Sequence, residues 1–586
     1  MGDVMDAANF SPDPRLTRAL RPAAHYPVVI IGGGINGAGV FRDLGLQGVD
    51  TLLIDAGDFC AGASAGPSRL IHGGIKYLES GEFRLVRQST LERNLLLKNA
   101  PHYVKPIETV LPIRSWFGGI IPSAVRFFGG KAKIKDRGLL ITKLGLELFD
   151  FYGRNHRVMP RHSVALRGAT ARAFPDLDRT VIATATYYDA RITHAERLGL
   201  ELLLDGMAAN PGSLALNHVT LGAAENGTLI LRDVISGKVS RVTADVVVNA
   251  GGAWIDRVNG QLGLATRHIG GNKGSHLILD NPRLFAALDG KMIYFGAADG
   301  RVGLLYPFMG RVLVGSTDIP VDDPDTAVCE DFERDYMLGT LGEVFPDIPV
   351  GPEQVVYAYC GVRPLPRADG LDPGGVSRDH SIATDTLPGT LPGVAPVPVH
   401  ALIGGKWTTF RGFAEEATDR VLRDLGLARR VGTTLTPIGG GADYPITEPE
   451  RAALIGRIMA AGVSQARAAT LLDRYGTRAL EVGAYCAANG DRLLRTLPDY
   501  TVGEIGFICV NEIIAGMSDV LFRRTDIALS GRLSVAVAEE VAAVMADTLG
   551  WSADWAEQEV SAVTARAGSH HGVTFATAPT STVLAG

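Results

Sequence analysis

The chain has 586 residues, a formal net charge of −6, 20% charged residues and 46% hydrophobic residues. It is longer than one compact core usually supports, so two or three domains are expected. The acidic balance argues against a nucleic-acid partner, and five scattered cysteines without CxxC spacing indicate neither a disulfide framework nor a metal site.

A dinucleotide cradle is predicted at the first clear element, over residues 28–39. This segment reads V-V-I-I-G-G-G-I-N-G-A-G, an apolar strand that runs into a glycine turn and a helix start. Gly32, Gly34 and Gly37 match GxGxxG: the first glycine allows a tight turn, the second lets a pyrophosphate approach the backbone, and the third lets helix pack on strand. A second predicted strand ends at Asp55, whose carboxylate can accept hydrogen bonds from an adenosine ribose.

Two more strand-to-glycine turns follow, one containing Ala250 and Gly251 and the other ending in Gly405. GxGxxG alone would also suit a nicotinamide coenzyme, but repeated glycine turns without a second complete GxGxxG favour the longer FAD. From about residue 452 the sequence changes to an Ala- and Leu-rich helical periodicity, which predicts a separate helical domain.

The predicted fold class is α/β. It comprises a Rossmann-like FAD-binding domain of discontinuous segments, an α+β substrate domain with an antiparallel sheet, and an all-α C-terminal domain. The expected boundaries are a disordered N-terminal arm (1–25), the FAD-binding domain (26–105, 190–265 and 355–430), the substrate-binding domain (106–189 and 266–354), the helical C-terminal domain (431–570) and a disordered tail (571–586).

Residues 114–137 are a local exception to the acidic chain. Six basic residues stand against one acidic residue in this segment, a balance of +5, and aromatic residues are interleaved with them. Such a segment can place aromatic groups at the lipid headgroups while its cations meet anionic lipid. An inserted loop whose aromatics pack on the domain is the alternative. The longest uncharged stretch, residues 386–405, contains four prolines and is not expected to span a bilayer.

Several separated motifs together resemble the FAD-dependent glycerol-3-phosphate dehydrogenase family, within the D-amino-acid-oxidase-like flavoproteins. The resemblance covers residues 26 to 565. Besides the opening glycine turn, the motifs are R-L-I-H-G-G-I-K-Y-L-E (69–79), E-F-R-L-V-R (82–87), K-G-S-H (273–276), G-S-T-D (315–318), G-V-R-P-L (361–365), S-R-D-H (377–380) and G-G-K-W-T-T-F-R (404–411).

The resemblance implies oxidation of sn-glycerol 3-phosphate to dihydroxyacetone phosphate by hydride transfer to flavin N5, with electrons passed to a membrane quinone. It also implies peripheral, monotopic attachment at the cytoplasmic face of the inner membrane, and leaves a homodimer as one option. Three alternatives stay open: a longer polyol phosphate such as erythritol phosphate, an oxygen-using glycerol-3-phosphate oxidase, and a flavin-binding RNA-modifying protein.

This reaction needs a base for the hydroxyl proton, cations for the substrate phosphate and positive charge near the flavin. Arg363, before Pro364, is predicted to hold the phosphate in a bidentate fork, and Arg378 is a second phosphate candidate. Lys406 follows the third glycine turn and is expected to stabilise the negative charge of a reduced flavin. His72 and His276 compete as the base, with His72 slightly favoured.

Two further positions bear on the substrate and the cofactor. Tyr77 is expected to bound the substrate pocket. Lys76 stands where the family pattern has arginine, so it keeps the charge but loses the planar fork, which is why the longer polyol phosphate stays open. The predicted cofactor-binding residues are Gly32, Gly34, Gly37, Asp55, Ser64, Ser68, Gly73, Gly74, Ala250, Gly251, Gly405, Thr408 and Thr409.

Overall fold

The computed structural model describes residues 23–78, 81–118, 138–154, 156–367, 379–387 and 396–575. Residues 1–22 and 576–586, most of the expected arm and tail, lie outside the described residues. The expected arm is too long, because residues 23–25 already pair with a neighbouring strand, from Ala23 opposite Arg241 to His25 opposite Thr243. The expected tail also begins too early, because His571 is the last residue of the final helix.

The first sheet carries the glycine turn. Its strands follow the order β17-β18-β10-β1-β2-β7, with β8 and β9 continuing from β10, and its centre is parallel. These strands are β1 (Ala23–Ile31), β2 (Thr51–Ile54), β7 (Leu214–Leu216), β8 (Val219–Glu225), β9 (Thr228–Asp233), β10 (Val239–Asn249), β17 (Ser381–Thr386) and β18 (Pro398–Ile403).

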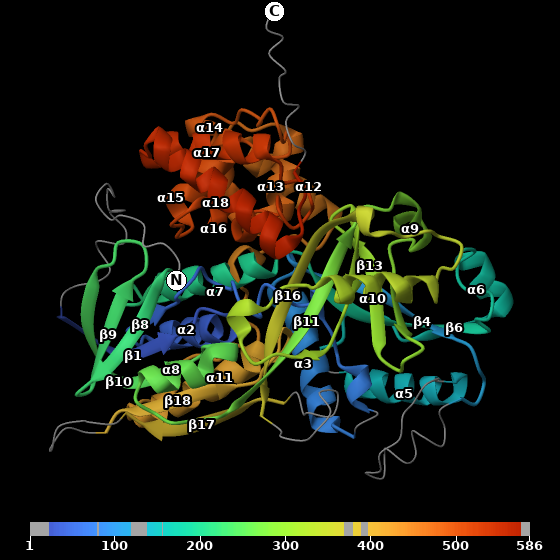
Figure 1. Ribbon diagram of the computed structural model, residues 1–586, viewed down its shortest axis with the longest axis horizontal. Helices are drawn as coiled ribbons and strands as arrows, with labels where there is room; N and C mark the ends of the chain where they lie inside the picture. The colour runs from blue at the N-terminus through green and yellow to red at the C-terminus, as the bar shows by residue number, and fades with distance from the viewer. Residues whose placement is uncertain are drawn as a thin grey trace, which may run out of the picture.

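Alternate residues of β1 face opposite sides of this sheet. Val28 and Ile30 pack with helices on one face, while Val29 and Ile31 pack with the β8–β9 hairpin on the other. Figure 1 shows helices gathered beside the strands of this sheet. The helices packed around it are α2 (Ile35–Gln47), α3 (Phe83–Asn99), α7 (Ala195–Ala209), α8 (Ile255–Gln261) and α11 (Phe410–Asp424).

The second sheet is mostly antiparallel. It follows the order β15-β11-β14-β13-β12-β4-β6-β3, with β16 on β11 and β5 on β6. Its strands are β3 (Leu70–Ile71), β4 (Val104–Ile113), β5 (Ser163–Leu166), β6 (Ala183–Ile192), β11 (Ile269–Leu279), β12 (Met292–Gly296), β13 (Val302–Phe308), β14 (Arg311–Gly315), β15 (Ile319–Pro320) and β16 (Val355–Pro366). Around it lie α5 (Leu139–Tyr152), α6 (Arg167–Ala173), α9 (Pro282–Ala287) and α10 (Asp331–Gly342).

The expected boundary at residue 355 does not match the strand pairing. That boundary places β16 in the FAD-binding domain, but β16 pairs antiparallel with β11 along its length, from Ile269 opposite Pro366 to Leu279 opposite Val355. The short strand β3 likewise pairs with β6 in the second sheet. The chain therefore crosses between the two sheets more often than the sequence indicates, and each crossing brings a loop to the junction between them.

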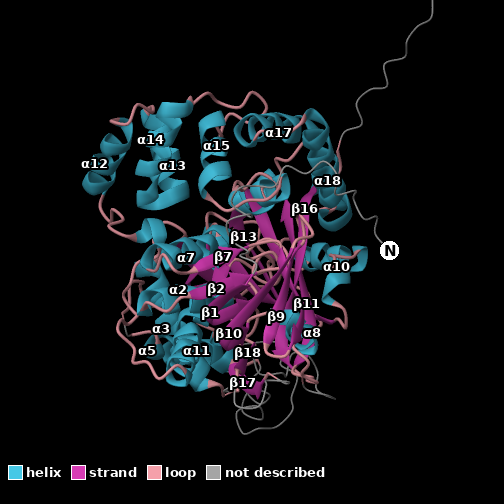
Figure 2. Cartoon of the chain, turned by 90° about the vertical axis from the view of Figure 1, so that its left-hand side faces the viewer, coloured by secondary structure: helices cyan, strands magenta, loops and turns pink. Residues whose placement is uncertain are grey.

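The C-terminal helices form a separate layer against the second sheet, as expected for an all-α unit (Figure 2). Tyr306, Phe308 and Tyr357 of that sheet share a core with Leu521 and Val541. None of the described helices is long and apolar enough to cross a membrane. The C-terminal elements are α12 (Glu448–Met459), α13 (Gln465–Tyr475), α14 (Ala479–Asn489), α15 (Val502–Asn511), α16 (Met517–Asp519), η10 (Val520–Arg524), α17 (Val535–Leu549) and α18 (Ala553–His571).

The β1–α2 turn leaves no room for side chains at two of its glycines. A Cβ at Gly37 would lie 1.9 Å from the carbonyl oxygen of Gly32, and a Cβ at Gly32 would lie 2.5 Å from the carbonyl oxygen of Ala250. We expect Gly37→Ala to lower the free energy of unfolding by roughly 1–3 kcal/mol, the usual cost of overpacking. Thermal unfolding of the purified variant measures this loss.

Gly260→Ala in α8 is the matched control, because a Cβ added there would meet no described atom within 4 Å. Alanine in that helix should raise the stability by about 0.5–1 kcal/mol. Equal melting temperatures for Gly37→Ala and the unaltered chain would show that the backbone at Gly32 and Gly37 can move apart to admit a methyl group.

Candidate active site

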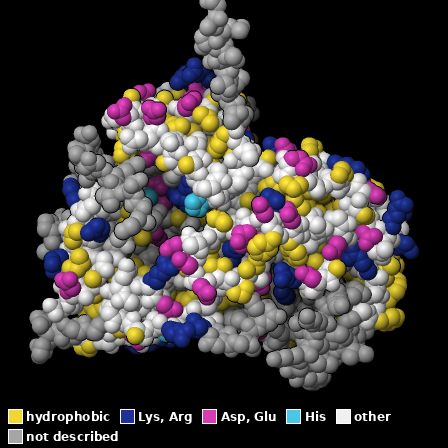
Figure 3. Space-filling model, viewed as in Figure 1, with side chains coloured by type: hydrophobic (Ala, Val, Ile, Leu, Met, Phe, Trp, Pro, Cys, Tyr) yellow, Lys and Arg dark blue, Asp and Glu magenta, His cyan; other side chains and the backbone are white. Residues whose placement is uncertain are grey.

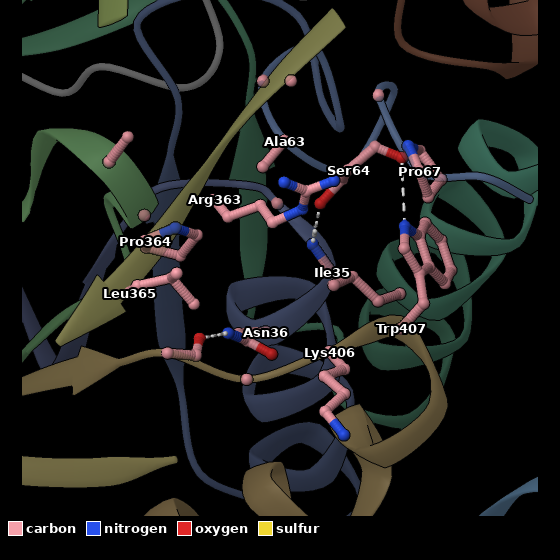
Figure 4. Close-up of a pocket in the computed structure, with 18 of the residues that line it drawn as sticks. Ile35, Asn36, Ala63, Ser64, Pro67, Arg363, Pro364, Leu365, Lys406 and Trp407 are labelled. Atoms are coloured by element: carbon pink, nitrogen blue, oxygen red, sulfur yellow. Dashed lines mark hydrogen bonds between the residues drawn. The ribbon is translucent and has the colours of Figure 1, made fainter. Parts of the chain in front are cut away.

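A cavity of about 1510 Å³ opens where the two sheets meet, and the predicted motifs converge on it. Its lining includes the β1–α2 turn, the residues that follow β10, part of β16 and the 404–408 turn. Figure 4 shows Ser64 and Arg363 on one side of this view and Lys406 on the other. This large cleft follows from the topology, because carboxyl ends of parallel strands meet at one edge of a sheet.

The end of the cavity at the glycine turn is held by backbone hydrogen bonds. The Gly33 N–H donates to Asp55 at 2.7 Å, and the Gly57 N–H donates to the other carboxylate oxygen at 2.9 Å. Burial raises the pKa of Asp55 to about 6, an effect that these two hydrogen bonds reduce. Ser64 reaches the same turn, because its hydroxyl accepts the Ile35 N–H at 3.0 Å. Asp55 and Ser64 therefore shape the turn and also line the cavity.

The 404–408 turn places a cation and an indole at the cavity. The ammonium of Lys406 lies 3.9 Å from the centre of the Tyr77 ring, a cation–π contact. The Trp407 indole donates to the backbone oxygen of Ser64 at 3.1 Å, which ties this turn to the 62–68 loop (Figure 4). Gly405 has a φ of +90°, and a Cβ there would lie 2.7 Å from the Asn36 amide nitrogen.

Arg363 projects from β16 into the cavity with its guanidinium already oriented. Its Nη1 donates to Asn272 at 3.0 Å and to Asp318 at 2.9 Å, and one quarter of its side chain is exposed. Gly274 makes room for this arrangement, because a Cβ there would lie 2.1 Å from Nη2 of Arg363. A guanidinium oriented in this way, at the wall of a cavity, is suited to bind an anionic ligand.

The two candidate histidines lie in different environments. His276 is buried, its Nε2 lies 2.7 Å from the Ser68 hydroxyl, and its ring stacks on Tyr359. Burial, with help from the charges of Arg363 and Arg69, lowers the pKa of His276 to about 3. His72 also lines the cavity but is only half-buried.

The remaining predicted residues are distributed around the same cavity. Lys76 is exposed, Tyr77 is buried, and both line the cavity. Gly37, Gly73 and Thr409 are not among its lining residues: Gly37 packs on Gly32, the Gly73 N–H is bound to Asp189, and Thr409 is buried in a short helix. Arg378 lies outside the described residues. Also on the lining are Gly32, Gly34, Asp55, Ser64, Ser68, Gly74, Ala250, Gly251, Gly405 and Thr408.

Sequence reasoning missed several residues that shape this site. Asp318 orients Arg363, and Asn36 donates from α2 to the Gly404 carbonyl oxygen at 3.2 Å. At the mouth, the Trp254 indole donates to Asp325 at 2.7 Å, and Arg257 pairs with the same carboxylate. Asp318 and Asn36 belong to motifs that the sequence singles out. No local sequence pattern predicts the contact between Trp254 and Asp325 at the mouth, since the two residues are 71 positions apart.

Comparisons with known proteins agree with this fold. Residues 27–389 match the model of the family described as FAD dependent oxidoreductase, and residues 431–556 match the C-terminal domain of alpha-glycerophosphate oxidase. A glycerol-3-phosphate dehydrogenase from Synechocystis is 30% identical, over 91% of this chain and 95% of its own length. Glycerol-3-phosphate dehydrogenase 2 of Mycobacterium tuberculosis is 29% identical, over 92% and 88% respectively.

Among solved structures, the glycerol-3-phosphate dehydrogenase from Bacillus halodurans complexed with FAD has a TM-score of 0.70 at 21% identity, covering 93% of this chain and 95% of that one. The chain belongs to the FAD-dependent oxidoreductases, within the glycerol-3-phosphate dehydrogenase family. This confirms the resemblance, the fold class and FAD as the cofactor.

The residues present fit FAD. The close backbone packing at Gly32 and Gly37 leaves the helix start open to a pyrophosphate. Two buried polar atoms on the cavity, Asn36 Oδ1 and His276 Nδ1, have no hydrogen-bond partner among the residues that the structure describes, which suits a polar ligand. Asp55 and Ser64 would hold the nucleotide end, and Lys406 would supply positive charge near the flavin.

The depressed pKa of His276 predicts a pH dependence of stability. Unfolding restores an ordinary imidazole with a pKa near 6.5, so between about pH 6.5 and pH 3 the unfolded chain binds the extra proton and the folded state loses stability as pH falls. At pH 4.5 this group lowers the free energy of unfolding by about 2–3 kcal/mol, because each unit of pH below the unfolded pKa costs about 1.36 kcal/mol. We expect His276→Gln to lose less thermal stability between pH 7 and pH 4.5 than the unaltered chain.

His25 provides the comparison, because its side chain is about half-exposed near the start of β1. His25→Gln should change the pH dependence of the melting temperature less than His276→Gln does. If His276→Gln follows the same curve as the unaltered chain, His276 is protonated in the folded state and the burial argument is wrong.

Proposed function

We propose that this chain oxidises sn-glycerol 3-phosphate to dihydroxyacetone phosphate. One observation carries the proposal: Arg363, oriented by Asp318 and Asn272, faces the same cavity as the glycine turn and Lys406. A fixed guanidinium beside a flavin site is suited to a small phosphorylated substrate. The names of the relatives, glycerol-3-phosphate dehydrogenases over most of their length, support the same substrate.

Bound FAD supplies the hydride acceptor, N5 of its flavin ring. Arg363 holds the substrate phosphate, and Lys406 places positive charge where negative charge develops on reduction. His72 takes the hydroxyl proton, because it lines the cavity and is only half-buried. His276 is less suited to accept this proton, because its Nε2 is engaged by Ser68 and a pKa of about 3 makes it a weak base.

Lys76 keeps a longer substrate under consideration. Lys76 is exposed and lines the cavity, as does the nearby His72. Its ammonium is a point charge on a flexible side chain, so it can accommodate a tetritol or pentitol phosphate. Anaerobic bleaching of the flavin absorbance separates the substrates. Rapid bleaching by sn-glycerol 3-phosphate, and slow or no bleaching by erythritol 4-phosphate and glycerol, is the expected result. Bleaching by erythritol 4-phosphate alone would reassign the substrate, and no bleaching by any would refute the reaction.

Arg363→Lys tests the phosphate contact. Lysine keeps the charge but loses the fork that Asn272 and Asp318 orient, so substrate binding should weaken more than the chemical step. We expect the concentration of sn-glycerol 3-phosphate that gives half-maximal flavin reduction to rise at least tenfold. The reason is that losing a hydrogen bond between charged groups weakens binding by about 1.5–3 kcal/mol. Stopped-flow absorbance measures this concentration.

Arg257→Lys is the control, because this arginine lines the cavity but is paired with Asp323 and Asp325 at the mouth. Its half-saturating concentration should change less than threefold, on the order of 0.5 kcal/mol for an exposed pair. A larger effect at Arg257 than at Arg363 would place the phosphate at the mouth of the cavity.

A flavin-binding RNA-modifying protein finds little support in the structure. On the face shown in Figure 3, basic and acidic side chains are interspersed, whereas RNA binding calls for a basic face. All five cysteines are described, and none is among the residues that line the cavity. Burial also raises the pKa of the Cys60 thiol far above its ordinary value, which makes it a poor nucleophile.

We also propose attachment to an anionic membrane surface with quinone as the electron acceptor. Residues 119–137 of the predicted contact segment lie outside the described residues, but the elements flanking them are apolar and exposed. Trp116 and Phe117 belong to the described part of that segment and are 49% and 69% exposed. After it, α5 exposes a stripe at helical spacing: Leu140, Leu144, Leu148 and Phe151. Oxygen stays the alternative acceptor, and fast reoxidation of the reduced flavin by air would favour it.

Charge substitution on the stripe tests this attachment. Leu144→Glu with Leu148→Glu removes apolar area from the face that would enter the lipid, and each buried leucine is worth about 1.5–3 kcal/mol. We expect co-sedimentation with phosphatidylglycerol vesicles to fall by roughly tenfold or more. Leu435→Glu, at an exposed position outside α5, is the control and should bind as before. Unchanged binding of the double variant would exclude α5 from the contact.

A further inference from the structure

The segment from Asp55 to Cys60 forms one wall of the cavity at the nucleotide end. Asp55, Ala56 and Gly57 line the cavity directly. The segment also embraces the glycine turn: Asp55 accepts the Gly33 N–H at 2.7 Å, and the Cys60 N–H donates to the Gly33 carbonyl oxygen at 3.0 Å. Any displacement of the segment would therefore move both a lining wall and the turn that faces the pyrophosphate.

The anchor of this segment is Asp58, and its partners come from the far end of the chain. The Asp58 side chain is fully buried. Arg524 donates hydrogen bonds to both carboxylate oxygens of Asp58, from Nη1 at 2.7 Å and from Nη2 at 2.9 Å. The Arg523 Nε donates to the same carboxylate. Both arginines belong to η10 of the C-terminal unit. Asn217 adds a fourth donor at 2.8 Å.

The two guanidinium groups are themselves held from the helical side. Arg524 donates to the backbone oxygens of Glu512 and Ile513, at 3.0 and 2.9 Å. Arg523 donates to Asp519 at 2.9 Å, and the His218 ring lies 3.1 Å from the same carboxylate. These two guanidinium groups therefore have little freedom to follow the 55–60 segment if that segment moves.

The charges in this cluster are balanced by protein groups. Burial alone would raise the pKa of Asp58, but Arg524 and Arg523 reverse the effect and lower it. Asp58, His218 and Asp519 lie close enough to share a metal ion, but each carboxylate already has a guanidinium partner. Removing one arginine would leave a single guanidinium to balance the two buried carboxylates, which is costly.

From this arrangement we infer that Arg523 and Arg524 are positioning residues for FAD, through which the C-terminal helical unit completes the cofactor site. Neither arginine is among the described residues that line the cavity. They act through Asp58, which holds the 55–60 segment against the glycine turn. The inference depends on FAD as the cofactor and is independent of the substrate.

The dissociation constant of FAD, measured by flavin fluorescence on dilution of the full-length holoenzyme, tests this inference. Arg524→Gln removes the fork and should raise this constant at least tenfold. The conservative Arg524→Lys keeps the charge and should give a smaller rise. Because Arg524→Gln can fail to fold, Asp58→Asn, which removes the charge and keeps the size, provides a second route with the same expected direction.

Arg467→Gln is the matched control. Arg467 is also buried and pairs with Glu504 at 2.9 Å, and its guanidinium also contacts Asp491, Asp499 and Thr501, which all belong to the C-terminal unit. Its loss should lower the melting temperature while leaving the FAD dissociation constant within twofold. The inference is overturned if Arg524→Lys and Asp58→Asn bind FAD as tightly as the unaltered chain, or if Arg467→Gln weakens FAD as much as they do. In either case the cluster would serve only to dock the helical unit.

Discussion

The close approach of backbone to backbone at the β1–α2 turn is the constraint on which the site depends. Gly32 and Gly37 let the turn lie against the end of β10, where any Cβ would collide with a carbonyl oxygen. That contact brings the start of α2, the positive end of its helix dipole, to the junction of the two sheets. Two other parts of the cavity lining are fixed to this turn by hydrogen bonds: Ser64 accepts the Ile35 N–H, and Asp55 accepts the Gly33 N–H.

The distribution of charge around the cavity explains how an acidic chain can bind an anionic substrate. At the mouth, Arg257 is engaged by two carboxylates, so its charge is largely neutralised there. Deeper in, Arg363 has Asp318 as its carboxylate partner, and Lys406 lies on the ring of Tyr77. In the proposed function these two cations meet the phosphate of the substrate and the negative charge of a reduced flavin, while the net charge of the whole molecule is −6.

Features with local signals were predictable from the sequence. The glycine turns, the strands before them and the helical C-terminal unit depend on short-range backbone geometry and periodicity, and the structure has all of them. Pairing between distant segments was not predictable. The pattern of β16 indicates a buried strand that could join either sheet, and only its register with β11 assigns it. Asp58 and Arg524 are 466 residues apart, so nothing near either one predicts their contact.

The most direct measurement is a crystal structure of the FAD-loaded, anaerobically reduced enzyme with sn-glycerol 3-phosphate bound. We expect phosphate oxygens about 2.7–3.2 Å from the Arg363 guanidinium, with His72 beside the substrate hydroxyl group that is oxidised. A phosphate bound instead at Lys76 or at the Arg257 mouth, away from Arg363, would contradict the proposed site.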